Sequence, residues 1–300
     1  MTAPDPGLDF HARVAALCPS FVADGEPRRF RKSEVLVGRV GELPILAKRL
    51  AKPDPVWAWY FAREVALYRA FAAEPPGLLV PRLVAAADDV LIVEHLAGEP
   101  LARERRPAAM LPIRTIAGLL AATDSLATWP HKPVHVAPSP RVRSQLRERL
   151  LEHPDEPTWV RDGIRLATKR GLVPESLGRT VDEALGRYTQ TAFGHGDLLL
   201  RNAISDDDDT VALVDWECAG MHPRDWDRAL LWTQLAPPAR GLVEDAVRDS
   251  GGRWRAFLGL VVFAFARELR FAGAFGPPDK TAAQRDAITA EMMAVAGRLA

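Results

Sequence analysis

Cysteine is scarce in this 300-residue sequence, and net charge is absent from it. The only cysteines are Cys18 and Cys218, which excludes a disulfide framework and a metal site built from several thiolates. A single bridge between the two stays open, although we expect free thiols in what resembles a cytosolic chain. The 39 basic and 39 acidic side chains cancel, so the overall charge gives no reason to expect nucleic acid or a membrane surface as a partner.

Long hydrophobic runs are also missing. The N-terminus has no basic stretch followed by a sustained apolar core, so we expect no signal peptide. The longest apolar run covers residues 256–266 (AFLGLVVFAFA) and is bounded by Arg255 and Arg267. Because a helix needs about 20 apolar residues to cross a bilayer, we expect this run to form a helix buried in a large core. We therefore expect a cytoplasmic globular protein with no membrane, nucleic-acid or obligate protein partner.

The first third of the sequence has the pattern of a sheet with one helix. Short runs rich in β-forming residues flank turn-forming segments such as GELP at 41–44. Asp54 and Pro55 are typical of a helix N-cap and first turn, and the aromatic residues behind them recur at helical spacing. The expected elements are strands at 33–40, 45–50, 82–87 and 90–94 and one helix from 55 to about 73.

After residue 100 the pattern changes to long helical segments. We expect these at about 107–128, 140–153, 157–170, 174–190, 239–249, 252–273 and 281–299. One β-hairpin interrupts them, with strands at 202–205 and 210–215 joined by a solvent-exposed turn of four aspartates, Asp206–Asp209. We therefore predict an α+β fold of two lobes: a small β-rich lobe with one helix at 1–94, a hinge at 95–100 and a larger, mainly helical lobe at 101–300.

The strongest functional signal is FGHGDLLLRN at 193–202, followed by VALVDWE at 211–217. A β-hairpin folds back on itself, so Asn202 at its entrance and Asp215 at its exit become neighbours, beside the carboxylate of Asp197. Hard divalent cations such as Mg²⁺ prefer oxygen ligands of this kind. A free carboxylate beside them can accept the proton of an attacking hydroxyl. HGD alone would most often be a turn with a structural histidine, but its spacing to Asn202 and Asp215 favours a catalytic site.

A second signal links a strand to a helix. Lys48 lies in the middle of the expected strand 45–50, and Glu64 follows in the aromatic-lined helix. A strand lysine held by a helical glutamate is the arrangement with which protein kinases bind the phosphates of their nucleotide. Alone, the two residues would be an exposed strand lysine and a solvated helix glutamate. Together they favour a phosphate clamp.

These motifs resemble those of the aminoglycoside phosphotransferase family, small-molecule kinases that share the protein-kinase fold. The resemblance covers about residues 30–235, with HGDLLLRN in place of the kinase catalytic loop and VDWE in place of Asp-Phe-Gly. It implies ATP or GTP as the phosphoryl donor, Mg²⁺ as the cofactor and a small-molecule hydroxyl as the acceptor. The residues that it implies are Asp197 as the catalytic carboxylate, Asn202 and Asp215 as magnesium ligands, Lys48 on the α- and β-phosphates, Glu64 orienting Lys48, the backbone of Glu94 and Leu96 at the purine, and His195 and Asp227 bracing the catalytic loop.

The sequence departs from the family pattern where a loop would cover the phosphates. It has no G-x-G-x-x-G motif, and the first long strand follows EPRRFRK instead. We therefore expect Arg31, Lys32 and the backbone of Ser33 to take over this role. Glu217 stands where Asp-Phe-Gly has its glycine, a change that leaves the expected metal site intact.

The acceptor is less directly indicated. Members of the family act on antibiotics or on metabolites such as choline and homoserine, so we expect antibiotic O-phosphorylation, with a metabolite kinase as the alternative. Residues 101–149 carry nine basic and three acidic side chains. If they line the cleft, a neutral or anionic acceptor, such as a nucleoside-type antibiotic, fits better than a classical aminoglycoside; these arginines could equally coat the outer surface. A nucleotide-binding pseudokinase is a further alternative, disfavoured by the intact catalytic set.

Overall fold

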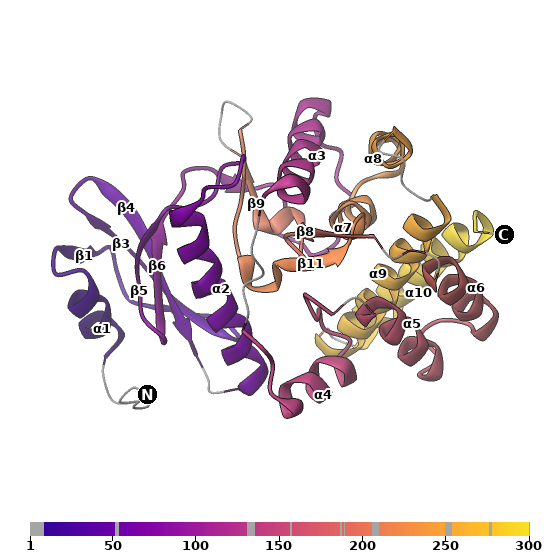
Figure 1. Cartoon of the computed structure of the whole chain (residues 1–300), viewed down its shortest axis with the longest axis horizontal. Helices are drawn as coiled ribbons and strands as arrows, with labels where there is room; N and C mark the ends of the chain where they lie inside the picture. Colours follow the sequence, from indigo (N-terminus) through magenta and orange to yellow (C-terminus); the bar gives the residue numbers. More distant parts are fainter. Residues whose placement is uncertain are drawn as a thin grey trace.

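The computed structural model describes residues 9–51, 54–130, 136–156, 158–186, 188, 190–205, 210–249, 254–275 and 278–299. An N-terminal antiparallel sheet and a mainly helical C-terminal part lie next to each other along the longest axis of the molecule (Figure 1). The α+β, kinase-like fold predicted from the sequence is confirmed. The expected turn at Asp206–Asp209 lies outside the described residues.

One six-stranded sheet forms the N-terminal part, in the order β1-β3-β4-β6-β5, with β2 paired to β3. Its strands are β1 (Phe21–Ala23), β2 (Arg28–Arg29), β3 (Ser33–Val40), β4 (Leu43–Leu50), β5 (Leu83–Ala86) and β6 (Val90–Glu94). Strands β3 and β4 form a tight hairpin, in which Gly41 takes the positive φ of 61° that a two-residue turn needs. Because the turn is this short, β4 begins at Leu43 rather than at residue 45.

Helix α2 (Pro55–Ala73) joins the sheet to the rest of the molecule and begins where the sequence predicts. The side chain of Asp54 accepts hydrogen bonds from the backbone N–H groups of Val56 and Trp57, so it satisfies two donors of the first turn. Helix α2 contacts β4 and β5 on one side and the segment after β10 on the other. A short helix before the sheet, α1 (Phe10–Leu17), was not expected; it packs against β1 and β6.

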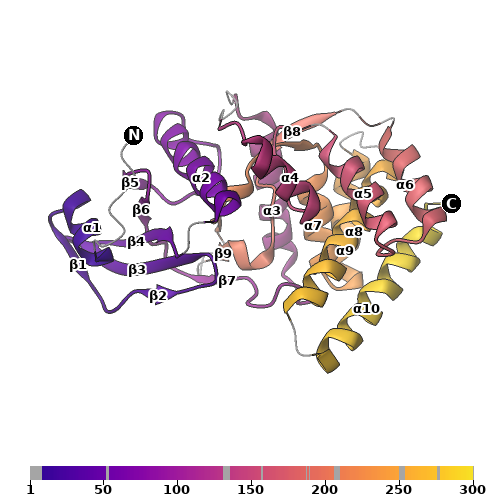
Figure 2. The same cartoon turned by 90° about the horizontal axis from the view of Figure 1, so that it is seen from below.

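The C-terminal part is built around α9 (Trp254–Phe275), which contacts α5, α6, α7, α8 and α10. The other helices are α3 (Ile113–Thr128), α4 (Pro140–Glu148), α5 (Trp159–Lys169), α6 (Glu175–Gly186), α7 (Trp226–Gln234), α8 (Pro237–Asp249) and α10 (Pro278–Gly297). Figure 2 shows α10 running along α9 at the far end of the molecule from the sheet. The apolar run 256–266 is buried at every position, as expected of a core helix. Among the described residues, no helix is both long and apolar enough to cross a bilayer.

Three helices are shorter than predicted from the sequence. Helix α3 begins at Ile113 rather than near residue 107, because Pro112 precedes it and the backbone of Ala109 bonds to Gln234 and Ala236 instead. Helices α4 and α6 end at Glu148 and Gly186, before the expected 153 and 190. The released segment after α4 carries Leu151 and Glu152 to the wall of the cavity described below.

Short strands between these helices position the loops of the site. The expected hairpin is formed by β9 (Ala203–Ser205) and β10 (Val211–Leu213), and β7 (Glu99–Pro100) adds a third strand. A second pair, β8 (Thr191–Gly194) with β11 (Gly220–Pro223), was not expected. Because β8 ends at Gly194, HGDLLLRN follows it as a loop at the junction of the two parts.

Candidate active site

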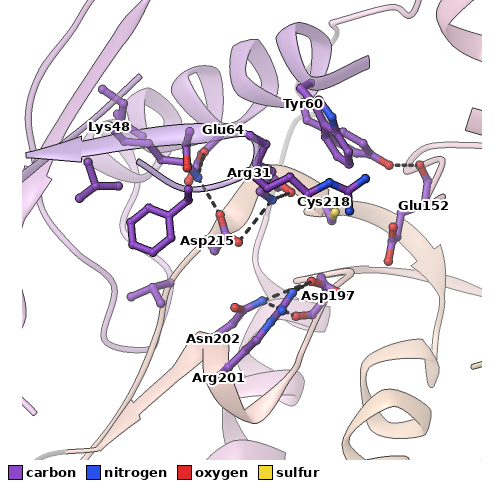
Figure 3. Close-up of a pocket in the computed structure, with 18 of the residues that line it drawn as sticks. Arg31, Lys48, Tyr60, Glu64, Glu152, Asp197, Arg201, Asn202, Asp215 and Cys218 are labelled. Atoms are coloured by element: carbon purple, nitrogen blue, oxygen red, sulfur yellow. Dashed lines mark hydrogen bonds and ion pairs between the residues drawn. The ribbon is translucent and has the colours of Figure 1, made fainter. Parts of the chain in front are cut away.

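A cavity of about 1070 Å³ lies between the sheet and the helical part. It is lined from the sheet side by β3, β4 and β6, from α2, and from the helical side by the loop after β8, the segment after β10 and α9. The eight residues predicted from the sequence as catalytic, nucleotide-binding or metal-binding are all on its wall: Ser33, Lys48, Glu64, Glu94, Leu96, Asp197, Asn202 and Asp215. Figure 3 shows the polar residues from both parts facing one another across this cavity.

Lys48 on β4 bridges two carboxylates. Its Nζ lies 2.8 Å from Oε2 of Glu64 on α2 and 2.7 Å from Oδ1 of Asp215 (Figure 3). The Lys48 side chain is 12% exposed and that of Glu64 only 3%, so these charges interact with little screening by water. Burial would lower the pKa of Lys48, but the charges of Asp215 and Glu64 outweigh it and raise the pKa well above its ordinary value. The lysine therefore stays charged, as a phosphate-binding group must.

Burial dominates at Glu64 and not at Asp215. It raises the pKa of Glu64 to about 7, even against the opposing charge of Lys48. At Asp215 burial acts in the same direction, but the ammonium groups of Lys32 and then Lys48 outweigh it, and the pKa is held below its usual range. Asp215 is thus ionised at any pH at which the protein functions, which a metal ligand requires.

Asp215 has an unusual backbone conformation. Its φ of 63° and ψ of 60° are left-handed, a region that aspartate and asparagine enter more readily than other residues with side chains. Just before it, the N–H of Val214 donates to the carbonyl oxygen of Asn202 at 2.9 Å, which fixes the segment after β10 against the end of the catalytic loop. The hairpin thereby brings Asn202 and Asp215 together, as predicted.

Buried hydrogen bonds hold the loop that carries Asp197. The Asp227 carboxylate accepts from the N–H of His195 at 2.6 Å and of Gly196 at 2.9 Å, and the indole of Trp226 donates to the Gly196 carbonyl at 2.8 Å. Gly196 has a φ of 81°, and a Cβ there would lie 2.2 Å from the carbonyl oxygen of Cys218, so only glycine fits. On the other side, the His195 ring bonds to the carbonyl of Val214 at 2.9 Å.

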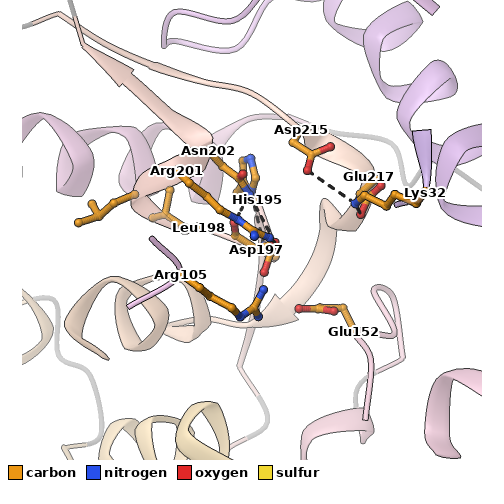
Figure 4. Close-up of polar contacts among 12 residues, drawn as sticks. Lys32, Arg105, Glu152, His195, Asp197, Leu198, Arg201, Asn202, Asp215 and Glu217 are labelled. Carbon is orange, nitrogen blue, oxygen red and sulfur yellow. Dashed lines mark hydrogen bonds and ion pairs between the residues drawn. The ribbon is translucent and has the colours of Figure 1, made fainter. Parts of the chain in front are cut away.

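Asp197 and Asn202 are in direct contact. The Nδ2 of Asn202 donates to the backbone carbonyl of Asp197 at 2.9 Å and lies 3.4 Å from its Oδ2. Because the amide nitrogen is occupied in this way, the Oδ1 of Asn202 remains as its metal-binding atom. Arg201 lies 3.8 Å from the Asp197 carboxylate, so this group faces the cavity with a cation on one side (Figure 4).

Oxygen ligands suited to Mg²⁺ are grouped at this point. Within the described part of the chain, Glu64, Asp215 and Glu217 place one carboxylate oxygen each within 4.8 Å of one another. Lys48 contacts both Glu64 and Asp215, but only Asp215 also has Asn202 as its neighbour across the hairpin. An all-oxygen set of one carboxylate and one amide, open to a nucleotide on the cavity side, fits the coordination preference of magnesium.

The segment before β3 supplies a second ammonium group. Lys32 forms an ion pair with Glu217, lies 3.8 Å from Oδ2 of Asp215 and sits 5.5 Å from the ring centre of Trp57. Arg31 and Ser33 line the cavity beside it, and the Ser33 carbonyl accepts the N–H of Phe30 at 2.8 Å, which closes the turn that presents Lys32. This basic turn lies just before β3, where the family pattern has a glycine-rich loop that this sequence lacks.

The purine is expected next to the end of β6, where two backbone N–H groups already donate to neighbouring segments. The N–H of Glu94 donates to the carbonyl of Arg82 at 2.9 Å, and the N–H of His95 donates to that of Pro44 at 2.9 Å. The backbone groups of this segment that the cavity can use are therefore the carbonyl of Glu94 and the backbone of Leu96. Leu46, Leu91 and Val93 provide the apolar surroundings there.

Sequence reasoning missed the residues at the other end of the cavity. There, Arg105 binds Glu268 and Arg267 binds Glu152, with Tyr60, Leu151 and Phe271 beside them. One signal was available: Arg267 and Glu268 directly follow the apolar run 256–266 on a helix that is otherwise buried. Arg105 and Glu152 lie in irregular segments, and nothing in their neighbourhood in the sequence marks them.

Comparison with known proteins agrees with this geometry. The profile of the phosphotransferase enzyme family, which includes the aminoglycoside phosphotransferases, matches residues 33–260. The chain belongs to this family. No protein of curated description matches the sequence.

Solved structures of this family have the same fold at low sequence identity. A macrolide 2′-phosphotransferase from Brachybacterium faecium is 17% identical, with a TM-score of 0.61 over 95% of this chain and 98% of the other. An aminoglycoside phosphotransferase of type APH(2″) in complex with GDP and kanamycin is 13% identical, with a TM-score of 0.60 over 97% of each chain. One from Streptomyces rimosus, in complex with ADP and streptomycin, is 18% identical over 84% of this chain and 95% of the other, with a TM-score of 0.50. The second and third of these structures hold a nucleotide, GDP or ADP, together with an antibiotic.

Proposed function

We propose that this protein transfers the γ-phosphoryl group of ATP or GTP to a hydroxyl group of a small molecule, and that the molecule is an antibiotic. One observation carries the proposal: Lys48, Asp197, Asn202 and Asp215 line one cavity, with the lysine on the sheet side and the three oxygen-bearing side chains on the helical side. A nucleotide bound between the two parts would meet all four groups. We take residues 1–94 as the nucleotide-binding lobe, 95–100 as the hinge and 101–300 as the catalytic lobe of a cytoplasmic enzyme.

Each group has a distinct role in this reaction. Lys48 binds the α- and β-phosphates, and Glu64 fixes its position through their 2.8 Å contact. Asn202 and Asp215 would hold Mg²⁺, which supplies positive charge to the phosphates when it is bound. Asp197 accepts a hydrogen bond from the acceptor hydroxyl, aligns its oxygen with the γ-phosphorus and takes up the proton. Alignment and electrostatics supply most of the rate enhancement in reactions of this kind.

The basic turn and the end of β6 complete the nucleotide site. Lys32 is placed to move from Asp215 and Glu217 onto the phosphates, with Arg31 and the backbone of Ser33 beside it. The carbonyl of Glu94 and the backbone of Leu96 would bond the edge of the purine. Adenine and guanine both offer a donor and an acceptor on that edge, so either nucleotide fits this proposal.

The cavity wall favours an acceptor that is less basic than a classical aminoglycoside. Of the eight basic residues at 101–149 that the structure describes, only Arg105 lines the cavity, so the excess of charge in that segment is not the reason. The reason is that the carboxylates at the acceptor end, Glu152 and Glu268, are already bound by arginines. A polycation would have to displace both, whereas a nucleoside-type or similar antibiotic would not. A choline- or homoserine-type metabolite kinase remains the second candidate, and a pseudokinase the third.

The role of Asp197 tests the proposal. We expect Asp197→Asn to lower phosphoryl transfer by about 10²–10⁴-fold, because general-base catalysis and alignment of the hydroxyl are lost. Nucleotide binding in the presence of Mg²⁺, measured by calorimetry, should stay within a few-fold of the wild type. The assay is consumption of nucleotide against panels of antibiotics and metabolites, with the added phosphate detected by mass spectrometry. Undiminished transfer by the variant would contradict the assignment, and Mg²⁺-dependent nucleotide binding without transfer to any panel member would favour the pseudokinase.

A further inference from the structure

The acceptor end of the cavity contains two arginines from distant segments. Arg105 follows β7, and its Nε lies 2.8 Å from both carboxylate oxygens of Glu268 on α9. Arg267, the preceding residue of α9, forms an ion pair with Glu152 from the segment after α4. All four side chains line the same cavity as the proposed catalytic residues.

Arg105 is placed beside the catalytic carboxylate. Figure 4 shows its guanidinium group next to Asp197 and facing Glu152. Burial lowers the pKa of Arg105, but the charges of Glu268 and then Asp197 outweigh it and raise the pKa, which is consistent with this proximity. Glu268 is bound through Nε alone, so the outer edge of the guanidinium is not used by its carboxylate partner. That edge is the part of Arg105 that can meet an acceptor molecule.

The unpartnered polar atoms at this end are all donors. Nη2 of Arg105 and both Nε and Nη1 of Arg267 are buried without a hydrogen-bond partner among the described residues, whereas no carboxylate oxygen of Glu152 or Glu268 is in that state. Arg267 is only 1% exposed, and burial, followed by the charge of Arg105, lowers its pKa to about 9. Buried donors left unpaired are unfavourable, so negative charge near them is favoured. A ligand can reach only the accessible part of this group, the Arg105 side chain, which is 23% exposed.

Apart from the two ion pairs, the described wall residues near this end are apolar or uncharged, and the cavity lining also includes the neutral side-chain amide of Gln284. The hydroxyl of Tyr60 donates to the backbone carbonyl of Glu152 at 2.5 Å. Leu151, Phe271 and Ala272 are apolar. Selection by charge at this end therefore depends on the two arginines.

We propose that the acceptor carries an anionic oxygen group, a carboxylate or a phosphate, which Arg105 binds through the outer edge of its guanidinium group, with the charge of Arg267 behind it. Bound in this way, the anionic group anchors the acceptor so that a hydroxyl elsewhere on the molecule reaches Asp197. Arginine suits this role because its planar fork matches the two oxygens of a carboxylate or phosphate. The inference rests on the proposed function and narrows its acceptor to hydroxy compounds with an acidic group.

The test uses three polyols that differ only in one terminal group: gluconate, gluconamide and glucamine, which are anionic, neutral and cationic. Each is titrated into the full chain saturated with Mg²⁺ and ADP, and binding is measured by calorimetry. We expect gluconate to bind about ten- to a hundredfold more tightly than the other two, the effect of hydrogen bonds to a charged group. Glucitol phosphate, run in parallel, shows whether carboxylate or phosphate is preferred.

The variants isolate the contribution of the guanidinium group. Arg105→Gln combined with Glu268→Gln removes the pair without leaving a buried charge, and should abolish the preference for gluconate while leaving the affinity for ADP unchanged. Arg103→Gln is the matched control, because Arg103 lies two residues away, is 87% exposed and pairs with Glu99 outside the cavity. Equal or weaker binding of gluconate by the wild type, or a preference that survives the double variant, overturns the inference. The binding of ADP is measured first. If ADP does not bind, the proposed nucleotide site is wrong; if it binds, the results with gluconate test the anionic acceptor alone.

Discussion

The two ends of the cavity differ in how their charges are matched. At the nucleotide end, Lys48 contacts Glu64 and Asp215 directly, and Lys32 contacts Glu217. At the acceptor end, each arginine has a carboxylate partner but keeps N–H groups that nothing in the described structure accepts. At the nucleotide end the lysines are paired with carboxylates in the absence of a ligand. At the acceptor end some arginine N–H groups have no acceptor among the residues described.

The proposed ligands of the two ends would account for this difference. A nucleotide brings its own counter-charge in the form of a metal ion, so the protein can hold lysines and carboxylates together until the complex displaces them. An acceptor brings no such ion, so the protein must supply the matching charge itself. The ends should therefore respond differently to substitution, and four predictions test this, from the largest expected effect to the smallest.

The largest effect is expected on stability at the acceptor end. Arg267→Met leaves Glu152 buried without its counter-charge, and should lower the free energy of unfolding by about 3–5 kcal/mol. Urea denaturation followed by circular dichroism measures it. The double variant Arg267→Met with Glu152→Gln should recover much of the loss, since the stranded charge is gone. If the single variant is no less stable than Arg103→Gln on the surface, the pair does not matter for folding.

At the nucleotide end the main effect should be on turnover. Asp215→Asn keeps a side chain that tolerates the left-handed backbone but removes the negative charge, so we expect phosphoryl transfer to fall by about 10²–10³-fold. The loss of its ion pair with the buried Lys48 should also lower the free energy of unfolding. The matched control is Asp155→Asn, because Asp155 also has a positive φ, of 69°, and lies off the cavity wall. Both variants keep a side chain suited to the left-handed backbone, so comparable losses would show that the effect is not specific to the charge on the cavity wall.

Glu64 gives the nucleotide end a pH dependence of stability. The folded pKa of Glu64, about 7, lies above the value of about 4.3 for an unfolded chain, so the folded state holds this proton more tightly. Its stabilising contribution is present at low pH and is lost as the pH rises from about 4.5 to 7, by about 2–3 kcal/mol. Glu64→Gln should remove that slope. The free energy of unfolding of both proteins is measured from about pH 4.5 to 7, and the wild type should lose more of it than Glu64→Gln. An equal pH dependence in both proteins would contradict the assignment.

The smallest effect is expected at the basic turn. Lys32→Ala removes one of two ammonium groups from the phosphate site, and should weaken the binding of ADP with Mg²⁺ by about tenfold. Arg29→Ala, in the exposed strand just before, is the control and should leave the affinity unchanged. Calorimetry at two salt concentrations separates a direct contact between Lys32 and the phosphates from long-range attraction between the protein and ADP. Only the long-range attraction is strongly screened by salt.

Much of the fold could be predicted because local signals agreed with one another. The cap at Asp54 and the aromatic spacing behind it predicted α2, and the apolar run 256–266 predicted the core of α9. The pair β8 and β11 escaped, because its strands are four residues each and are joined only through contacts between distant segments. Helix starts were misplaced where a proline and a backbone pairing, as at Ala109, decided the boundary.

The nucleotide end could be predicted for a different reason than the fold. Asp197, Asn202 and Asp215 lie within one loop and one hairpin, so their proximity follows from short-range geometry. Arg105 and Glu268 are separated by 163 residues, and no local pattern announces that they meet. The residues that we propose to select the acceptor therefore become visible only once the helical part is folded.

Position 215 has two requirements in the proposed mechanism: a negative charge and a residue that tolerates the left-handed backbone. A glutamate would retain the negative charge and a glycine would retain the backbone, but neither keeps both, so a population drifting through single substitutions finds no working neighbour. Asparagine shares the conformational preference but gives up the charge, so in the proposed mechanism it would keep the backbone and lose most of the phosphoryl transfer.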